Sequence, residues 1–194
     1  MVSIVWISTG IVVGLLVFVY VLYTRMIRLK NTALEALSGI DVQLRKRHDL
    51  IPNLLKLARR YMEHEIAIIK EVTELRVSAE KAMGTTDPSE AARRFSAESA
   101  LTSGIGRLFA VMENYPDLKA DQPIIEAQQA YQEVEGHVSA ARRFYNAAVA
   151  DLNSAIETFP GPFIAPLAKA KPMPLYEVED AAVRKPIDAD DFLL

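Results

Sequence analysis

The chain opens with a stretch that lacks any charged side chain, and this stretch most constrains the fold. It runs from Val2 to Tyr23, a length of 22 residues. A helix of that length crosses the hydrocarbon core of a bilayer, which is about 30 Å thick. Basic residues follow at once, and the remaining chain is polar enough to be soluble. The sequence therefore predicts a transmembrane anchor over residues 1–24 and a domain that works from the membrane surface.

A cleaved signal peptide is the alternative interpretation of this stretch. Signal peptides place positive charge before a core of about 7–15 apolar residues. Here no Lys or Arg precedes the core, the core is longer, and no small-residue cleavage site follows at Thr24. Trp6 and Tyr23 near its two ends suit the aromatic belts of membrane interfaces. We therefore expect a retained anchor.

The flanking charges predict the orientation of the anchor. Residues 25–47 hold six basic side chains and two acidic ones, whereas the other flank carries only the amino terminus. Basic residues near a membrane helix stay on the cytoplasmic side. The N-terminus is therefore expected outside and residues 25–194 in the cytoplasm.

Composition narrows the classes of function. The net charge is −3, so nothing favours nucleic acid as a partner. Cysteine is absent, which removes disulfides, thiolate chemistry and cysteine metal sites. About 135 residues between the anchor and Phe159 suffice for one domain with a full core.

Apolar spacing predicts four long helices after the anchor. The first continues from the membrane to about His48, where Asp49-Leu-Ile-Pro52 interrupts it. Either the chain turns back there or one long helix kinks, and we expect a turn. The second and third helices are expected at about 50–83 and 88–115.

The fourth helix has the clearest pattern. Apolar residues from Ala127 to Phe159 alternate steps of four and three, as on the contact face of an antiparallel bundle. We expect an all-α fold in which the transmembrane helix precedes an antiparallel up-and-down four-helix bundle with long helices. The bundle domain is expected to span residues 25–165.

Residues 166–194 are expected to form a Pro-rich extended or disordered tail. Residues 160–194 hold six of the ten prolines. The stretch FPGPFIAPL at 159–167 is not expected to be helical, yet it is apolar and should lie against the bundle. The acidic and apolar ending at 188–194 is interpreted as a frayed terminus rather than a docking motif.

One charged residue, Glu65, falls on the apolar stripe of the expected second helix. A buried carboxylate needs a partner or must become neutral. Hairpin register places it near Arg107, Gln128 and Tyr131, and Gly104 and Gly106 should allow close helix approach. We hypothesise that these four polar residues form an internal cluster that specifies helix pairing rather than catalysis.

Asn146 and Asn153 lie seven residues apart beside the core stripe of the fourth helix. They form either a polar contact with a partner or a register-setting polar layer inside the bundle. The second interpretation is favoured, because polar residues at such positions often specify pairing.

Motifs for chemistry are missing from the sequence. His64-Glu65 begins like a zinc-protease helix, but Ile68 stands where the second histidine is required. Neither a phosphate-binding loop nor a G-x-S-x-G motif occurs. We expect no catalytic residue, no cofactor and no metal.

Four segments, at 40–55, 61–65, 113–120 and 141–165, resemble the LemA family and occur in its order. The segment after Ala165 departs from the usual family ending, a glycine-and-aromatic stretch. The residues that match the family motifs are Asp41, Asp49, Pro52, Asn53, His64, Glu65, Tyr115, Pro116, Asn146 and Asn153.

The resemblance implies a single-pass protein of the bacterial cytoplasmic membrane, with its N-terminus outside and a long helical bundle. Some members are associated with magnetosome membranes, and some sit beside a membrane zinc protease; no enzymatic activity is established for the family. Two hypotheses follow. The chain is a non-enzymatic scaffold or adaptor that assembles with itself or with other membrane proteins, or it is an accessory subunit of a membrane enzyme such as a zinc protease.

Overall fold

The computed structural model describes residues 2–83 and 90–177, with side chains described from Trp6 onward. Every regular element in these residues is helical, which confirms the all-α prediction. The elements are α1 (Val2–Ala58), α2 (Ile66–Ala82), α3 (Ala91–Met112), α4 (Pro116–Ala120), α5 (Gln122–Glu157) and α6 (Gly161–Ile164).

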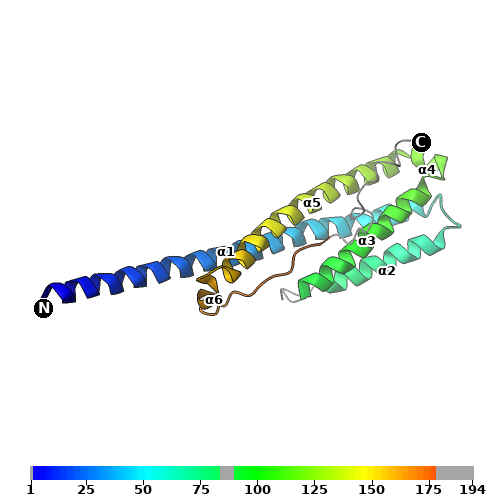
Figure 1. Cartoon of the computed structure of the whole chain (residues 1–194). Coiled ribbons are helices and arrows are strands. Elements are labelled where there is room, and N and C mark those ends of the chain that lie inside the picture. The colour runs from blue at the N-terminus through cyan, green and yellow to red at the C-terminus, as the bar shows by residue number, and fades with distance from the viewer. Residues whose placement is uncertain (1, 84–89, 178–194) are drawn as a thin grey trace, which may run out of the picture.

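The apolar N-terminal run forms the first part of α1. Among the described helices, α1 is the one that is long and apolar enough to cross a membrane. Its side chains from Trp6 to Val21 are all exposed, and burial begins at Met26. In Figure 1 this part extends away from all other elements as a single helix.

The expected turn at Asp49–Pro52 is wrong, because α1 continues through Pro52 to Ala58. Proline has no N–H, so the carbonyl of His48, four residues earlier, loses its partner within the helix. Arg76 of α2 replaces that partner, since its Nε donates to the His48 carbonyl oxygen at 3.1 Å. Pro52 itself lies on the exposed face. A tertiary contact therefore satisfies the backbone where the local rule predicts a break.

The chain reverses instead between Ala58 and Ile66. The expected second helix is consequently too long at its start, because residues 50–58 belong to α1 and α2 begins at Ile66. The prediction for α5 is confirmed to within a few residues at each end, and the prediction for α3 is confirmed to within a few residues at its C-terminal end. The expected start of the third helix at Asp87-Pro88 lies outside the described residues.

The helices associate as two antiparallel pairs, α1 with α5 and α2 with α3 (Figure 1). Direct contact between α1 and α2 is limited. The helical fold therefore consists of two antiparallel pairs, whereas the regular four-helix bundle of the prediction is not confirmed.

Two hydrophobic cores lie along the body. The core nearer the apolar run joins Ala33–Leu44 of α1 to Val138–Leu152 of α5 and to Phe95 of α3. The distal core joins Ile51–Ala58 of α1 to α2, to α4 and to the second half of α3.

The C-terminal segment packs on the first core. Ile164, Ala165, Met173 and Tyr176 are buried there. The burial of Ile164 and Ala165 confirms that the apolar stretch at 159–167 lies against the helices. The prediction that residues 159–167 contain no helix is wrong for the single turn of α6, because Pro162 stands in the first turn, where a missing N–H is tolerated. Residues 171–177 are extended, as expected.

Candidate functional site

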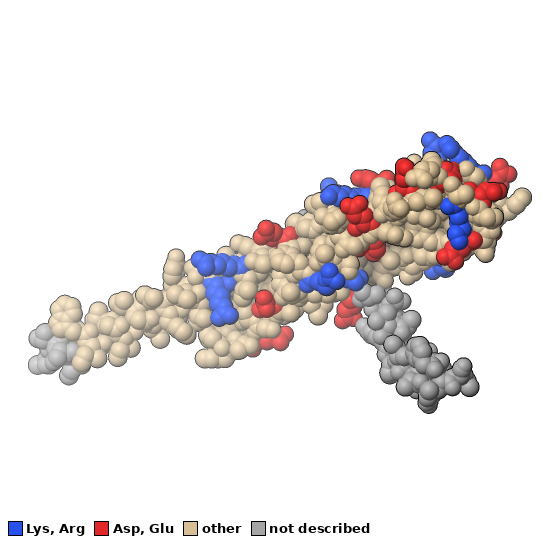
Figure 2. All heavy atoms as spheres, turned by 90° about the horizontal axis from the view of Figure 1, so that it is seen from above, with Lys and Arg blue, Asp and Glu red and all other residues tan. Residues whose placement is uncertain are grey.

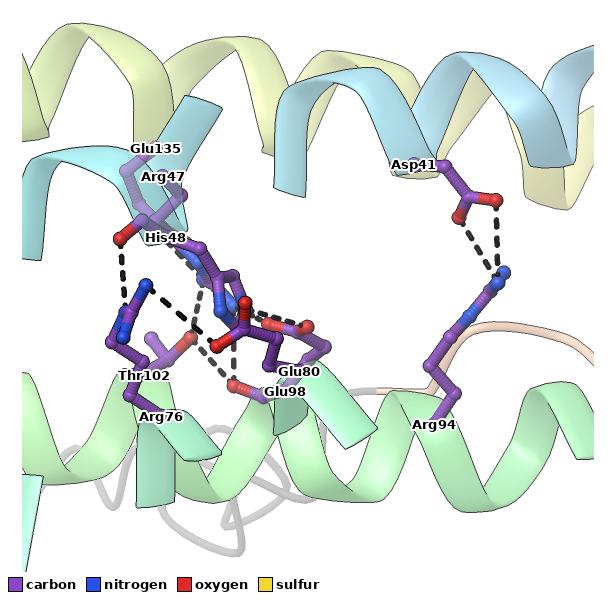
Figure 3. Close-up of polar contacts among 9 residues, drawn as sticks. All are labelled: Asp41, Arg47, His48, Arg76, Glu80, Arg94, Glu98, Thr102 and Glu135. Carbon is purple, nitrogen blue, oxygen red and sulfur yellow. Dashed lines mark hydrogen bonds and ion pairs between the residues drawn. The ribbon is translucent and has the colours of Figure 1, made fainter. Parts of the chain in front are cut away.

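Four ionisable side chains, three of them buried, form a group that we call the ionic layer: Arg47, His48, Glu98 and Glu135 (Figure 3). They come from α1, α3 and α5. Arg47, His48 and Glu98 are each at most 3% exposed. Charges this deep in a protein persist only when they are paired.

The helical repeat places these residues inside. On α1, Arg47 follows Leu44 by three residues and precedes Ile51 by four, so it lies on the same face as these two core residues. On α3, Glu98 stands between Phe95 and Leu101 in the same way. Because Leu44 and Phe95 belong to one core and Ile51 and Leu101 to the other, the ionic layer separates the two cores.

Arg47 is the centre of the layer. Its Nη2 contacts the Glu98 carboxylate directly, and its Nη1 lies 3.0 Å from Glu135 Oε2. The same Nη1 donates to Thr102 Oγ1 at 2.7 Å. One guanidinium thus joins α1 to both α3 and α5, a use for which its planar fork of donors is suited.

His48 completes the layer on the side of α2. Its Nε2 lies 2.9 Å from the second oxygen of Glu98, so both oxygens of that carboxylate are bonded. Its main-chain carbonyl accepts the bond from Arg76, and Arg76 also lies 3.7 Å from Glu80. Through these contacts the layer reaches all four long helices.

A second ion pair lies on the same side of α3, nearer the apolar run. Arg94 is 2% exposed, and its Nη1 lies 3.0 Å from Asp41 Oδ1 (Figure 3). It ties α3 to α1 once more, about one helical turn from the ionic layer.

These contacts shift the pKa values of the groups involved. Burial acts to raise the pKa of Glu98, but the hydrogen bond with His48 and the charge of Arg47 outweigh burial and hold that pKa below its ordinary value. Burial opposes the charge of Arg47, and the two carboxylates raise its pKa nonetheless. Burial raises the pKa of Asp41 against the opposing effect of Arg94. Glu98 is therefore ionised at neutral pH.

This arrangement suits structure rather than reaction. Each carboxylate is held by a cation, and the layer lies between packed cores. Breaking one member strands its partner, so such a layer favours one helix arrangement over others. Within residues 2–83 and 90–177, no group of three His, Asp or Glu side chains is placed to hold a metal ion.

The hypothesised cluster around Glu65 is wrong. Glu65 precedes α2 and accepts a hydrogen bond from the Tyr115 hydroxyl at 3.2 Å. Arg107 pairs with Glu71 on the surface. Tyr131 is buried against Phe109, with ring centroids 5.5 Å apart, and Gln128 is half-buried on the preceding turn of α5.

The cause is the register of the α2–α3 hairpin. Gly104 faces Leu75, and a Cβ at Gly104 would lie 2.6 Å from Leu75 Cδ1. Glu65 therefore meets Tyr115 rather than Ile105. Close helix approach is confirmed at Gly104, whereas a Cβ at Gly106 would meet no atom within 4 Å.

Asn146 and Asn153 bind the chain's own C-terminal segment, so neither interpretation of them is correct. Asn153 donates to the Met173 carbonyl at 2.9 Å and accepts from its N–H at 3.0 Å. Asn146 likewise donates to the Tyr176 carbonyl at 3.1 Å and accepts from the Tyr176 N–H at 2.8 Å. Seven helical residues and three extended residues both span about 10 Å, which explains the match of spacings. We call these two residues the asparagine clamp.

The remaining motif residues lie apart from the ionic layer. Near the end of α1, the exposed motif residues are Asp49, Pro52 and Asn53. His64 is exposed in the reversal that follows, and Tyr115 and Pro116 mark the start of α4.

Sequence reasoning missed the ionic layer, although a signal was present. The three-and-four spacing of α1 continues without a gap through Leu44, Arg47, Ile51 and Leu54. A charge at a core position of an unbroken repeat predicts a buried partner on a facing helix. Reading the helix as broken at Asp49 hid that position.

The sequence model of the LemA family matches residues 36–190, which is most of the chain. The match includes the ionic layer and the asparagine clamp. A search of curated proteins finds no match.

Proposed function

We propose that this chain, which belongs to the LemA family, is a non-enzymatic scaffold that holds its helical body at the bacterial cytoplasmic membrane. One observation carries the proposal: the apolar run and the helix at the centre of the body are one uninterrupted helix, α1. Anchor and body are thereby joined without a flexible linker. Such a molecule is suited to organising a membrane or membrane-protein complexes.

The proposed orientation places the N-terminus outside and the body in the cytoplasm. Support comes from Arg25, Arg28 and Lys30, which follow the uncharged run directly.

The absence of cysteine allows a direct test of this orientation. We expect Ser96→Cys, at an exposed position of α3, to be protected from a membrane-impermeant thiol reagent in intact cells. Ser3→Cys, at the other end of the apolar run, serves as the matched control and should be labelled. Labelling of Ser96→Cys without permeabilisation would reverse the orientation.

Self-association is part of the proposed function. Anchoring confines copies to one surface, which raises their effective concentration. The body also presents exposed apolar side chains on several elements, including Val42, Ile66 and Phe144. We expect the full-length protein in mild detergent to have a mass greater than that of one chain. A single-chain mass across detergents and concentrations would contradict the scaffold.

A further inference from the structure

Three apolar side chains stand out from the body where α5 ends. Phe159 is 80% exposed, Phe163 is 71% exposed and Leu167 is 64% exposed. Exposure of neighbouring apolar side chains to water is unfavourable, so a patch of them indicates an interaction surface. We call these three residues the interfacial foot.

The foot lies beside the end of the apolar run. One pocket is lined on one side by Leu22, Met26 and Leu29 of α1 and on the other by Phe159 and Ile164. In Figure 1, α6 lies at the end of the body that faces the apolar run. The foot is therefore at the level of α1 residues 22–29.

That level corresponds to the surface of a membrane. The uncharged run ends at Tyr23, so the hydrocarbon core ends near this residue. Residues 22–29 rise about 10 Å along the helix, and the headgroup region is about 5–8 Å deep on each side. Aromatic side chains are enriched in this region of membranes.

The charges at this level fit a surface with anionic headgroups. Four basic residues lie here, and one acidic residue, Asp151 of α5, lines the same pocket as Arg25. Figure 2 shows basic side chains gathered where the narrow uncharged part of α1 meets the body. The basic residues are Arg25, Arg28, Lys30 and Lys169.

Packing holds the foot in place. A Cβ at Gly161 would lie 1.9 Å from the carbonyl oxygen of Ala155, so only glycine allows this close return onto α5. Ile164 is buried, and Lys30 Nζ donates to the carbonyl of Ala168 at 3.4 Å. The rings of Phe159 and Phe163 meet edge to face, 6.1 Å apart.

We propose that the interfacial foot inserts into the headgroup region of the bilayer that α1 spans, as a second membrane contact beside the anchor. A phospholipid surface is favoured over a second copy of the chain because the foot adjoins the exposed apolar surface of α1 and is flanked by basic residues. The proposal rests on the insertion of α1, and the experiment separates the two.

The test uses the full-length protein in vesicles of phosphatidylcholine and phosphatidylglycerol with acyl chains brominated near the headgroup. Trp6 is the single tryptophan of the chain, so the wild type reports on the anchor. Phe163→Trp in a Trp6→Phe background reports on the foot. Phe144→Trp in that background is the matched control, because Phe144 is also exposed but lies about 22 Å farther along α5.

We expect the bromines to quench Phe163→Trp as strongly as Trp6 and to leave Phe144→Trp unchanged. Quenching of Trp6 without quenching of Phe163→Trp would overturn the foot and leave the anchor standing. Equal quenching of Phe144→Trp would also overturn it, because the whole body would then lie on the membrane. If Trp6 is not quenched, both the anchor and the foot are refuted.

Discussion

Glu98→Gln should destabilise the protein more than any comparable change on its surface. Glu98 is fully buried, and its carboxylate binds both Arg47 and His48. The amide keeps the size of the side chain but removes its charge, which leaves Arg47 undercompensated. Breaking a buried ion pair by removing one partner costs about 3–5 kcal/mol.

Two contacts of Arg47 remain in the variant. Glu135 lies 3.0 Å away and is one-third exposed, and Thr102 still accepts a hydrogen bond. We therefore expect the lower end of the range, about 3 kcal/mol. For a chain of this length that loss lowers Tm by about 6–12 °C. Circular dichroism of the full-length protein in detergent measures this change.

Glu71→Gln is the matched control. It removes the same charge from the Glu71–Arg107 pair, in which both side chains are about half exposed. Water screens such a pair, so the expected loss is at most about 1 kcal/mol. If the two variants lower Tm equally, the ionic layer does not hold the helices together and the reasoning is refuted.

The Tm difference between the wild type and Glu98→Gln should depend on pH. The pKa of Glu98 is lowered in the folded state, so its contribution is present above the ordinary glutamate value, about 4.5, and is lost as pH falls through the folded pKa. The Tm difference between wild type and Glu98→Gln should therefore persist near neutral pH and shrink in acid. A difference that grows in acid would contradict the assigned charge.

Three further changes probe other contacts. Gly161→Ala should lower Tm, because its Cβ would meet the Ala155 carbonyl oxygen. Gly106→Ala, in the open middle of α3, is the control and should stabilise the protein by about 1 kcal/mol. A higher Tm in Gly161→Ala would contradict the packing of α6. Asn153→Ala should speed tryptic cleavage after Lys169, and Asn53→Ala, on the exposed face of α1, should not; equal rates would show that the asparagine clamp does not hold the segment. Arg76→Met should destabilise the protein by about 1–3 kcal/mol in the presence of Pro52. The loss of stability should be smaller in a Pro52→Ala background, because the alanine restores an N–H for the His48 carbonyl. A loss of stability that does not depend on residue 52 would refute the role of Arg76 as the replacement donor.

Periodicity predicted the elements whose stability comes from an apolar face. The steps of four and three from Ala127 to Phe159 describe α5 closely, and its core side chains Val138, Tyr145 and Leu152 are buried. Burial of an apolar stripe is the main source of helix stability in proteins, so the pattern is visible without tertiary information.

The features that the sequence did not reveal depend on contacts between distant residues. Pro52 is locally a helix breaker, and the donor from Arg76 replaces the backbone hydrogen bond that Pro52 removes from α1. The partner of Glu65 is Tyr115, and it depends on the register of α2 against α3. The partner of Asn146 lies 30 residues away, on a segment with no periodic signal.

In the proposed topology, the continuity of α1 links the tilt of the anchor to the position of the body. From Thr24 to Ala58 the helix is about 51 Å long, and no hinge interrupts it. A change of roughly 10° in the tilt of the membrane segment, well within the range known for such helices, displaces Ala58 sideways by about 9 Å. If the anchor tilts to match a thinner or thicker bilayer, the far end of the protein moves without any rearrangement inside it.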